Sequence, residues 1–209
     1  MDDAPPPPVA APCEVMPMPD TRRLVKLCED YGENAEIAVG LGPPVRVRRL
    51  PLHCEYAAEF HGAVSWPCGQ ILAFFVAEYL AQHLPSTRVL ELGCGVAALP
   101  SISACRAGAS VLATDLPDII EMTKQNTAAN DISIRAEPLN WTQGHQPELL
   151  SSFDIVLGAD ILSDPSCHYS LLLQLETMVD AGGAAVFVAE RCRSAQTVFF
   201  ETFLPEAGW

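Results

Sequence analysis

The sequence predicts an α/β fold whose central sheet is doubly wound and mostly parallel. Two observations carry this prediction. Short apolar runs alternate with longer segments of helical periodicity through most of the chain, and a glycine turn follows the first of these runs. Alternation of this kind builds a parallel sheet that helices cover on both faces. The 209 residues are enough for one domain with a substantial core.

Composition divides the chain into three regions. Residues 1–20 are rich in Pro and Ala and show no periodicity, so we expect a disordered tail. Residues 21–65 form an N-terminal extension, in which residues 45–50 alternate apolar and basic side chains as a half-exposed strand does. The alternative is that these basic side chains contact a partner. Residues 66–209 are expected to hold the α/β domain.

The first element of the α/β domain is expected to be a helix over residues 69–84. Pro85 ends this helix, because proline cannot continue the backbone hydrogen bonds. The apolar residues that fall on one face of the helix are Leu72, Phe75, Val76, Tyr79 and Leu80.

Strands and helices then alternate along the rest of the chain. The expected strands are 88–92, 110–114, 132–137, 153–158 and 183–189. The expected helices are 97–106, 118–129, 167–179 and 195–203. Pro117 suits the first turn of the second of these helices. Gly182 and Gly183 are expected to break the chain between the third of these helices and the last strand.

The turn after the first strand is the strongest candidate for a ligand site. The segment Gly93-Cys94-Gly95-Val96-Ala97-Ala98 fits the loose G-x-G-x-x-G/A pattern, and Asp115 lies about twenty residues further on. Glycines let the backbone approach a ligand, and a carboxylate at the end of the second strand accepts the hydroxyls of a ribose. This pattern leaves three alternatives open: S-adenosylmethionine, NAD, or a turn that binds nothing.

Two features disfavour a dinucleotide. A helix-forming segment precedes the first strand, whereas dinucleotide turns usually open their domain. The sequence also ends soon after the fifth strand, before a second mononucleotide half and a substrate domain.

Five ordered segments between about Gly62 and Phe203 carry a family resemblance. The segments are Trp66-Pro67-Cys68-Gly69, 89–95, Thr114-Asp115, Leu139-Asn140-Trp141 and 153–160. Together they resemble the seven-strand methyltransferase-like protein lysine methyltransferases. The resemblance implies a Rossmann-like sheet of the seven-strand type and an S-adenosylmethionine-dependent protein N-methyltransferase, a reaction that needs no metal.

The resemblance assigns the glycine turn to the cofactor. Gly93, Cys94 and Gly95 would line the methionine end of S-adenosylmethionine, and Asp115 would accept the ribose hydroxyls.

The resemblance also implies roles for residues from later segments. Trp141 would pack against the adenine, Trp66 would close the pocket, and Ala159 would touch the cofactor. Aromatic faces suit both an adenine and a sulfonium cation. Asp160 would orient the methyl-accepting head group as the catalytic carboxylate. The alternatives are ordinary core packing for Trp66 and Trp141, and a turn or helix-entry role for Asp160.

The chain departs from the family pattern after the fourth strand. The family carries Asp-x-x-Tyr there, whereas this chain has Asp160-Ile161-Leu162-Ser163 and lacks the tyrosine. Together with the Trp-Pro-Cys-Gly start at residues 66–69 and the continuation Gly95-Val96-x-x-Leu99-Pro100, the absent tyrosine resembles the branch linked to histone arginine methylation. We therefore expect lysine as the first acceptor and arginine as the alternative, although no pair of glutamates stands out as a guanidinium clamp.

The family's sheet continues with two strands that this sequence does not contain, so the C-terminal strands are expected to be missing. The resulting edge would be exposed. We expect weak cofactor binding or low stability of this chain alone.

Charge and cysteine content bound the partners. The net charge of −14 disfavours nucleic acid and suits a protein substrate with a basic segment, or simply maintains solubility. No apolar span reaches the roughly 18 residues that a membrane helix needs. The eight cysteines include no C-x-x-C pair, which favours reduced thiols and a cytoplasmic or nuclear location. The rival functions are a non-catalytic binding module and an NAD-dependent oxidoreductase.

Overall fold

The computed structural model describes residues 32–143, 152–188 and 194–209. Its centre is a five-stranded parallel sheet with the order β5-β4-β3-β6-β7. The strands are β3 (Arg88–Leu92), β4 (Ser110–Asp115), β5 (Arg135–Pro138), β6 (Phe153–Ala159) and β7 (Val179–Val188). The predicted α/β class and the parallel sheet are confirmed.

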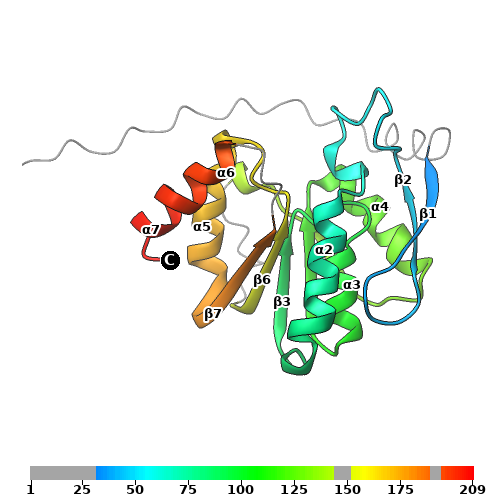
Figure 1. Cartoon of the computed structure of the whole chain (residues 1–209), viewed down its shortest axis with the longest axis horizontal. Helices are drawn as coiled ribbons and strands as arrows, with labels where there is room; N and C mark the ends of the chain where they lie inside the picture. Colours follow the sequence, from blue (N-terminus) through cyan, green and yellow to red (C-terminus); the bar gives the residue numbers. More distant parts are fainter. Residues whose placement is uncertain (1–31, 144–151, 189–193) are drawn as a thin grey trace, which may run out of the picture.

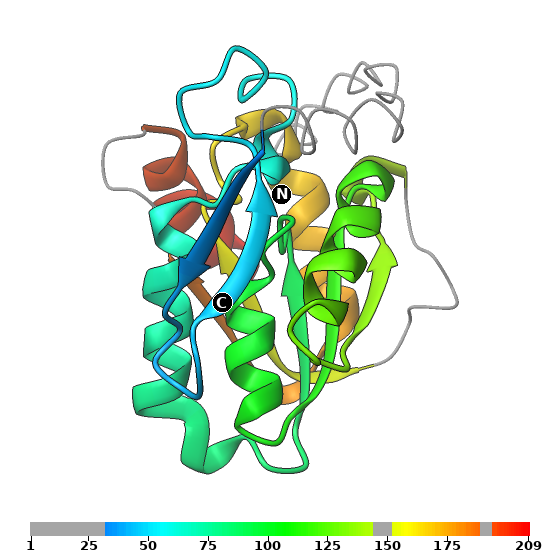
Figure 2. The same ribbon diagram turned by 90° about the vertical axis from the view of Figure 1, so that its right-hand side faces the viewer.

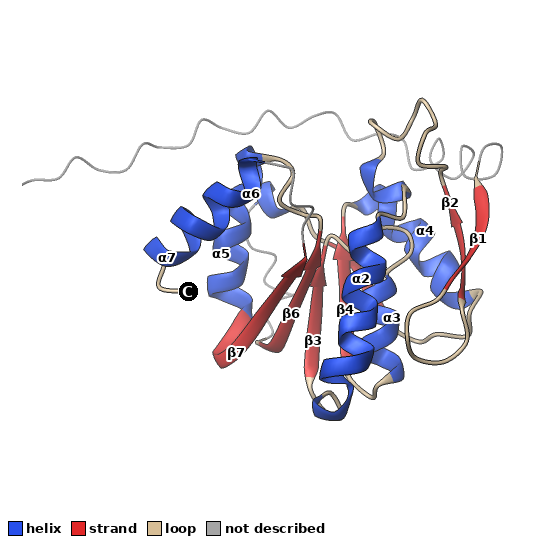
Figure 3. Ribbon diagram, viewed as in Figure 1, coloured by secondary structure: helices blue, strands red, loops and turns tan. Residues whose placement is uncertain are grey.

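Helices cover both faces of this sheet (Figures 1 and 3). On one side lie α2 (Pro67–Phe75), α3 (Leu99–Arg106) and α4 (Pro117–Ala128). On the other side lie α5 (His168–Met178), α6 (Ser194–Val198) and α7 (Leu204–Glu206). The short helical turns are η1 (His61–Ala63), η2 (Val76–Leu80), η3 (Ala81–His83), η4 (Trp141–Gln143), η6 (Pro165–Cys167) and η7 (Phe199–Phe203). Within the described part of the chain, no helix combines the length and apolar character needed to cross a bilayer.

The strand order reverses beside β3. From β3 the chain moves outward through β4 to β5, and it then returns to β6 on the other side of β3. Leu92 of β3 is paired with Gly158 of β6, so these two strands end together. In an open parallel sheet the crevice at this switch point is where ligands bind.

A two-stranded antiparallel hairpin lies outside the layer of α3 and α4 (Figure 2). It consists of β1 (Glu33–Ile37) and β2 (Val45–Arg49). Val45 and Val47 of β2 are buried, which confirms the predicted half-exposed strand. Asn126 of α4 fixes the hairpin, because its amide accepts from Arg48 N at 2.9 Å and donates to Arg48 O at 3.0 Å.

The hairpin shares its hydrophobic cluster with the α/β domain. Val45 and Val47 belong to the same buried cluster as Val96 and Ile102. Hydrophobic packing therefore crosses residue 66, where the sequence predicts a boundary between the extension and the α/β domain. That boundary stays a prediction. The tail expected at residues 1–20 lies outside the described residues.

Two local predictions need correction, and one strand was not predicted. The glycines Gly182 and Gly183 do not separate a helix from a strand, because β7 already begins at Val179. They lie where the pairing of β6 with β7 shifts register, and Gly182 has φ +85°, a conformation that favours glycine. Strand β5 begins three residues later than expected, at Arg135. Strand β1 was not anticipated.

The helix predicted over 69–84 is also only partly correct. It begins at Pro67, is α-helical to Phe75 and continues as the π-helical turn η2 and the short turn η3. Leu72 and Val76 face the core as expected, whereas Phe75 and Tyr79 are 38% and 63% exposed.

Candidate functional site

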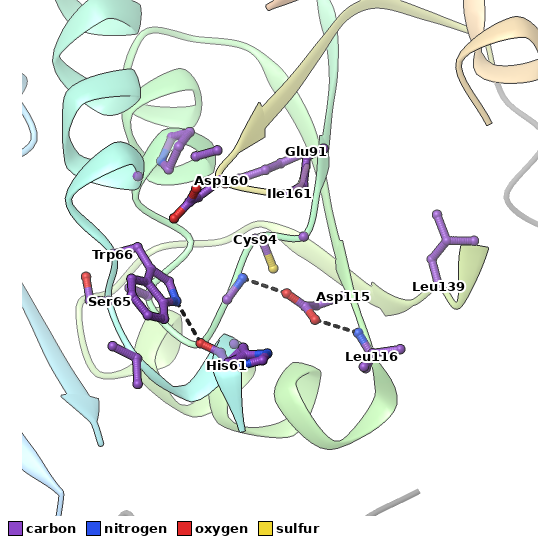
Figure 4. A pocket seen from close by; sticks show the side chains of 18 of the residues that line it. His61, Ser65, Trp66, Glu91, Cys94, Asp115, Leu116, Leu139, Asp160 and Ile161 are labelled. Carbon is purple, nitrogen blue, oxygen red and sulfur yellow. Dashed lines mark hydrogen bonds between the residues drawn. The ribbon is translucent and has the colours of Figure 1, made fainter. Parts of the chain in front are cut away.

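A cavity of about 270 Å³ lies at the carboxyl ends of β3, β4 and β6, at the switch point of the sheet. Figure 4 shows side chains that line it. The eight predicted site residues that all line this cavity are Trp66, Gly93, Cys94, Gly95, Asp115, Trp141, Ala159 and Asp160. They come from segments that lie up to 94 positions apart, so the fold gathers them rather than local sequence.

The glycine turn has a backbone that requires glycine. Gly93 and Gly95 have φ +66° and +61°, the left-handed region that residues with a Cβ rarely adopt. A Cβ on Gly95 would lie 3.1 Å from the carbonyl oxygen of Gly62. The same carbonyl accepts from Val96 N at 2.8 Å. Gly62 therefore holds the turn in place, and both segments line the cavity.

Asp115 is fastened to this turn. Its Oδ2 accepts a hydrogen bond of 2.7 Å from Gly95 N, and its Oδ1 accepts one of 2.7 Å from Leu116 N (Figure 4). Burial raises the pKa of Asp115 to about 6, and these two hydrogen bonds oppose the rise. Each carboxylate oxygen retains a lone pair for a ligand hydroxyl, because an ionised carboxylate accepts about four hydrogen bonds.

Glu91 is a cavity residue to which no role was assigned from the sequence. Its side chain is 1% exposed and accepts a hydrogen bond of 2.9 Å from Ser101 N in the first turn of α3. Burial raises its pKa to about 8. The sequence held a signal for this residue, because a glutamate interrupts an apolar strand and carboxylates are almost never fully buried unless they are paired. A cationic ligand beside Glu91 would favour its ionised form.

The two tryptophans differ in how their indole groups are satisfied. Trp66 caps the start of α2, and its Nε1 donates to His61 O at 3.0 Å. Trp141 begins η4, and its ring lies 3.6 Å from the position that a Cβ on Gly93 would take. The Nε1 of Trp141 is buried and has no hydrogen-bond partner among the described residues. Such an orphaned donor at a cavity suits a ligand acceptor.

Asp160 follows β6 in a strained conformation. Its φ is +58°, which is uncommon for a residue with a side chain, and its N–H donates to Val188 O of β7 at 2.8 Å. It lines the cavity together with Ile161 and Cys167. Ser163, at the place of the family's tyrosine, is exposed and is not among the lining residues.

Two further points concern chemistry at this rim. Glu190 and Arg191 follow the last expected strand and are predicted either to hold a substrate or to form an ion pair, and they lie outside the described residues. Among the residues that the structure describes, no three His, Cys, Asp or Glu side chains are grouped so that they could hold a metal ion.

Comparisons with known proteins address the same region. A family model described as lysine methyltransferase matches residues 50–205. Histone-arginine methyltransferase METTL23 of Xenopus laevis is 32% identical over 142 residues, covering 65% of this chain and 57% of the relative. The METTL23 of Rattus norvegicus is 34% identical over 160 residues, covering 72% and 64%. Calmodulin-lysine N-methyltransferase of Arabidopsis thaliana is 28% identical over 128 residues, covering 58% and 42%. The chain therefore spans less than two thirds of the length of these relatives.

Solved structures share the fold at low sequence identity. A 16S rRNA methyltransferase of T. thermophilus, in complex with AdoMet and guanosine, superposes with a TM-score of 0.58 at 18% identity, covering 81% of this chain and 44% of that chain. A ribosomal protein L11 methylase of Lactobacillus delbrueckii subsp. bulgaricus superposes with a TM-score of 0.54 at 22% identity, covering 68% and 69%. At these identities the likeness establishes the architecture alone.

Proposed function

The chain belongs to the lysine methyltransferase family, and on that premise we propose that it transfers a methyl group from S-adenosyl-L-methionine to a side-chain nitrogen of a protein. Lysine is the first acceptor that we propose. The observation that carries the proposal is the glycine turn with Asp115 hydrogen-bonded to Gly95, at the switch point of a sheet of the family's fold.

The residues of the cavity fit this cofactor. The turn at Gly93 and Gly95 leaves backbone, not side chain, on the cavity wall. Asp115 is positioned to accept ribose hydroxyls, and the orphaned Nε1 of Trp141 can donate to a ring nitrogen. The volume of about 270 Å³ is close to the lower end of small-molecule sites.

Two carboxylates and two aromatic rings would hold the cofactor. Asp115 would fix the ribose, and Glu91 would give up its proton when a positive charge binds beside it. The indoles of Trp66 and Trp141 would exclude water and stabilise the adenine and the sulfonium by their faces. When bound, the cofactor supplies an electrophilic methyl group on a positively charged sulfur.

Asp160 would position the acceptor. Its carboxylate lies at the cavity rim, where it would accept a hydrogen bond from the attacking amine and align the nitrogen lone pair. A protonated lysine cannot attack, so the amine must lose a proton to solvent or to a nearby base before transfer. Alignment and exclusion of water are the main contributions of the protein, because the methyl group is already activated.

Arginine is the second candidate acceptor. Two relatives that are at least 32% identical are named histone-arginine methyltransferases. The chain also has Ser163 in place of the tyrosine of Asp-x-x-Tyr, a difference that the sequence shares with the arginine-methylating branch. Asp160 would then accept from the guanidinium.

We propose a basic segment of a protein as the partner, since the net charge of −14 attracts cations and repels nucleic-acid phosphates. A cytosolic or nuclear location is supported by Cys54, Cys94 and Cys105, which form no disulfide within the described part of the chain.

Labelled methyl transfer tests this function against a non-catalytic binding module. The protein is incubated with a cell lysate and S-adenosyl-L-methionine that carries a labelled methyl group. We expect labelled protein bands whose hydrolysates contain methyllysine, or methylarginine for the alternative. Gly93→Arg should abolish the label, because its side chain would fill the cavity and collide with Ile161. Equal labelling by the wild type and Gly93→Arg would contradict the proposal.

A further inference from the structure

Ile161 lies where the glycine turn, the end of β6 and the acceptor side of the cavity meet. A Cβ on Gly93 would lie 2.6 Å from Cγ2 of Ile161, and a Cβ on Gly158 would lie 2.6 Å from its Cδ1. The branched side chain therefore packs directly against the Cα atoms of Gly93 and Gly158. It also lines the cavity (Figure 4).

The backbone explains why the side chain points there. Strand β6 ends at Ala159, and Asp160 then takes a left-handed conformation while its N–H is bound to Val188 O. The left-handed residue turns the chain out of the extended strand conformation, and Ile161 follows it against Gly93 and Gly158 at the end of the sheet. The strain at Asp160 thus places two neighbouring residues at the rim.

Ile161 has little room to move aside. Phe187 of β7 lies 2.7 Å from the position of a Cβ on Gly158, on the same side as Cδ1 of Ile161. The indole of Trp141 lies 3.6 Å from the position of a Cβ on Gly93, beside Cγ2 of Ile161. A β-branched side chain also has few rotamers. The side chain forms a rigid part of the cavity wall.

We propose that Ile161 determines the size of the alkyl group that the site accepts on the sulfur of the cofactor. This inference rests on the proposed function. The transferred group must lie between the glycine turn, which would hold the methionine end, and Asp160, which would hold the acceptor. Ile161 touches Gly93 and follows Asp160 in the chain, so its Cγ2 lies at the junction of the two half-sites. A methyl group fits beside a fixed methyl branch, whereas a larger group would have to displace it.

Calorimetric titrations with three cofactor analogues test this inference. The ligands are S-adenosylhomocysteine, S-adenosylmethionine and S-adenosylethionine, which carry no alkyl group, a methyl and an ethyl on the sulfur. We expect the wild type to bind the ethyl compound at least about tenfold more weakly than the methyl compound, the discrimination that one added methylene commonly produces. The quantity compared is the ratio of these two Kd values.

Three substitutions separate the branch over Gly93 from the rest of the side chain. Ile161→Ala removes both contacts, and Ile161→Leu removes the β-branch while conserving volume. Both should lower the ethyl-to-methyl ratio by roughly fivefold or more. Ile161→Val keeps Cγ2 and loses only Cδ1, so its ratio should stay within about twofold of the wild type. Cooperative thermal unfolding shows that each variant is folded. Should Ile161→Ala not fold, the Kd ratio of Ile161→Leu decides the test.

The outcomes distinguish this inference from the proposed function. A wild type that binds neither S-adenosylhomocysteine nor S-adenosylmethionine contradicts the proposed function, and the inference falls with it. A wild type that binds both, with the same Kd ratio in the folded Ala or Leu variant, overturns the role of Ile161 alone. A ratio that relaxes equally in Ile161→Val also overturns it, because the branch over Gly93 would then be irrelevant.

Discussion

Carboxylates at the two ends of strands β3 and β6 differ in burial and in the direction of their pKa shifts. At their amino ends, Asp154 is 41% exposed and pairs with Arg88 at 3.3 Å, and hydrogen bonds from the Arg88 backbone and side chain lower its pKa. At their carboxyl ends, burial raises the pKa of Glu91 to about 8, and that of Asp115 at the neighbouring end of β4 to about 6.

This difference separates a structural ion pair from a candidate binding site. In the exposed pair, Arg88 stabilises the ionised form of Asp154. The buried carboxylates lack a cation among the described residues, and they bear a desolvation cost that a positively charged ligand would offset. Carboxylates with perturbed pKa values in a cavity mark a candidate functional site.

The largest effect on activity is expected at Asp160. Asp160→Asn keeps a residue that tolerates the left-handed conformation but removes the charge that would orient the acceptor. We expect the rate of methyl transfer to fall by about 100-fold. The Kd of S-adenosylhomocysteine should change by less than about twofold, since the cofactor contacts remain. Steady-state kinetics and calorimetry measure the two quantities. Loss of cofactor binding instead would assign Asp160 to the cofactor.

Asp115 tests the comparison between the two ends directly. Asp115→Asn removes the negative charge and makes the side chain present an amino group to Gly95 N or Leu116 N, both of which donate. Cofactor affinity should fall by roughly 10- to 100-fold, the value of a hydrogen bond to a charged group. The matched variant Asp154→Asn, at the other end of the strands, should leave the affinity unchanged. Equal effects of the two variants would remove the distinction between the two ends.

The buried carboxyl of Glu91 makes the free energy of unfolding depend on pH. Its pKa rises from 4.5 to about 8 on folding, so between these values the folded protein holds a proton that the unfolded chain has released. The free energy of unfolding must therefore fall as the pH rises through this window. Glu91→Gln keeps an oxygen acceptor for Ser101 N and does not ionise.

Thermal unfolding of the ligand-free protein between pH 5 and 9 measures this effect. At pH 8 we expect the Tm of Glu91→Gln to exceed that of the wild type by about 10 °C, and the two curves should converge near pH 5. Parallel curves across the whole range would show that Glu91 is ionised in the folded protein.

The smallest expected effect concerns the orphaned indole nitrogen. Trp141→Phe keeps an aromatic face and removes Nε1. Cofactor affinity should fall by about three- to tenfold, the value of one neutral hydrogen bond. Trp209→Phe is the control, because Trp209 is 44% exposed and does not line the cavity. An unchanged Kd for Trp141→Phe would mean that its nitrogen has no ligand acceptor.

Local patterns predicted the parts of the site that depend on backbone. Gly93, Gly95 and Asp115 are recognisable because a tight turn and a carboxylate at a strand end follow from short sequence segments. Trp66, Trp141 and Asp160 were placed by the family resemblance, and the fold brings them to the same cavity.

Features that depend on tertiary burial were missed. The raised pKa of Glu91 arises because α3 and the turn enclose it, which one residue in an apolar run does not specify. Strand β1 has the sequence Glu-Asn-Ala-Glu-Ile with mixed burial, so its pattern lacks a clear alternation, and within the described part of the chain it pairs with β2. In the sequence, Gly182 indicates a chain break. In the structure, the conformational freedom of glycine allows a positive φ inside strand β7 instead.

The crystal structure of the protein with S-adenosylhomocysteine tests the central claim most directly. We expect the ligand in the cavity at the ends of β3, β4 and β6, with both ribose hydroxyls within about 2.6–3.2 Å of the Asp115 carboxylate and the adenine beside Trp141. A ligand bound elsewhere, or a ribose that makes no contact with Asp115, would contradict it.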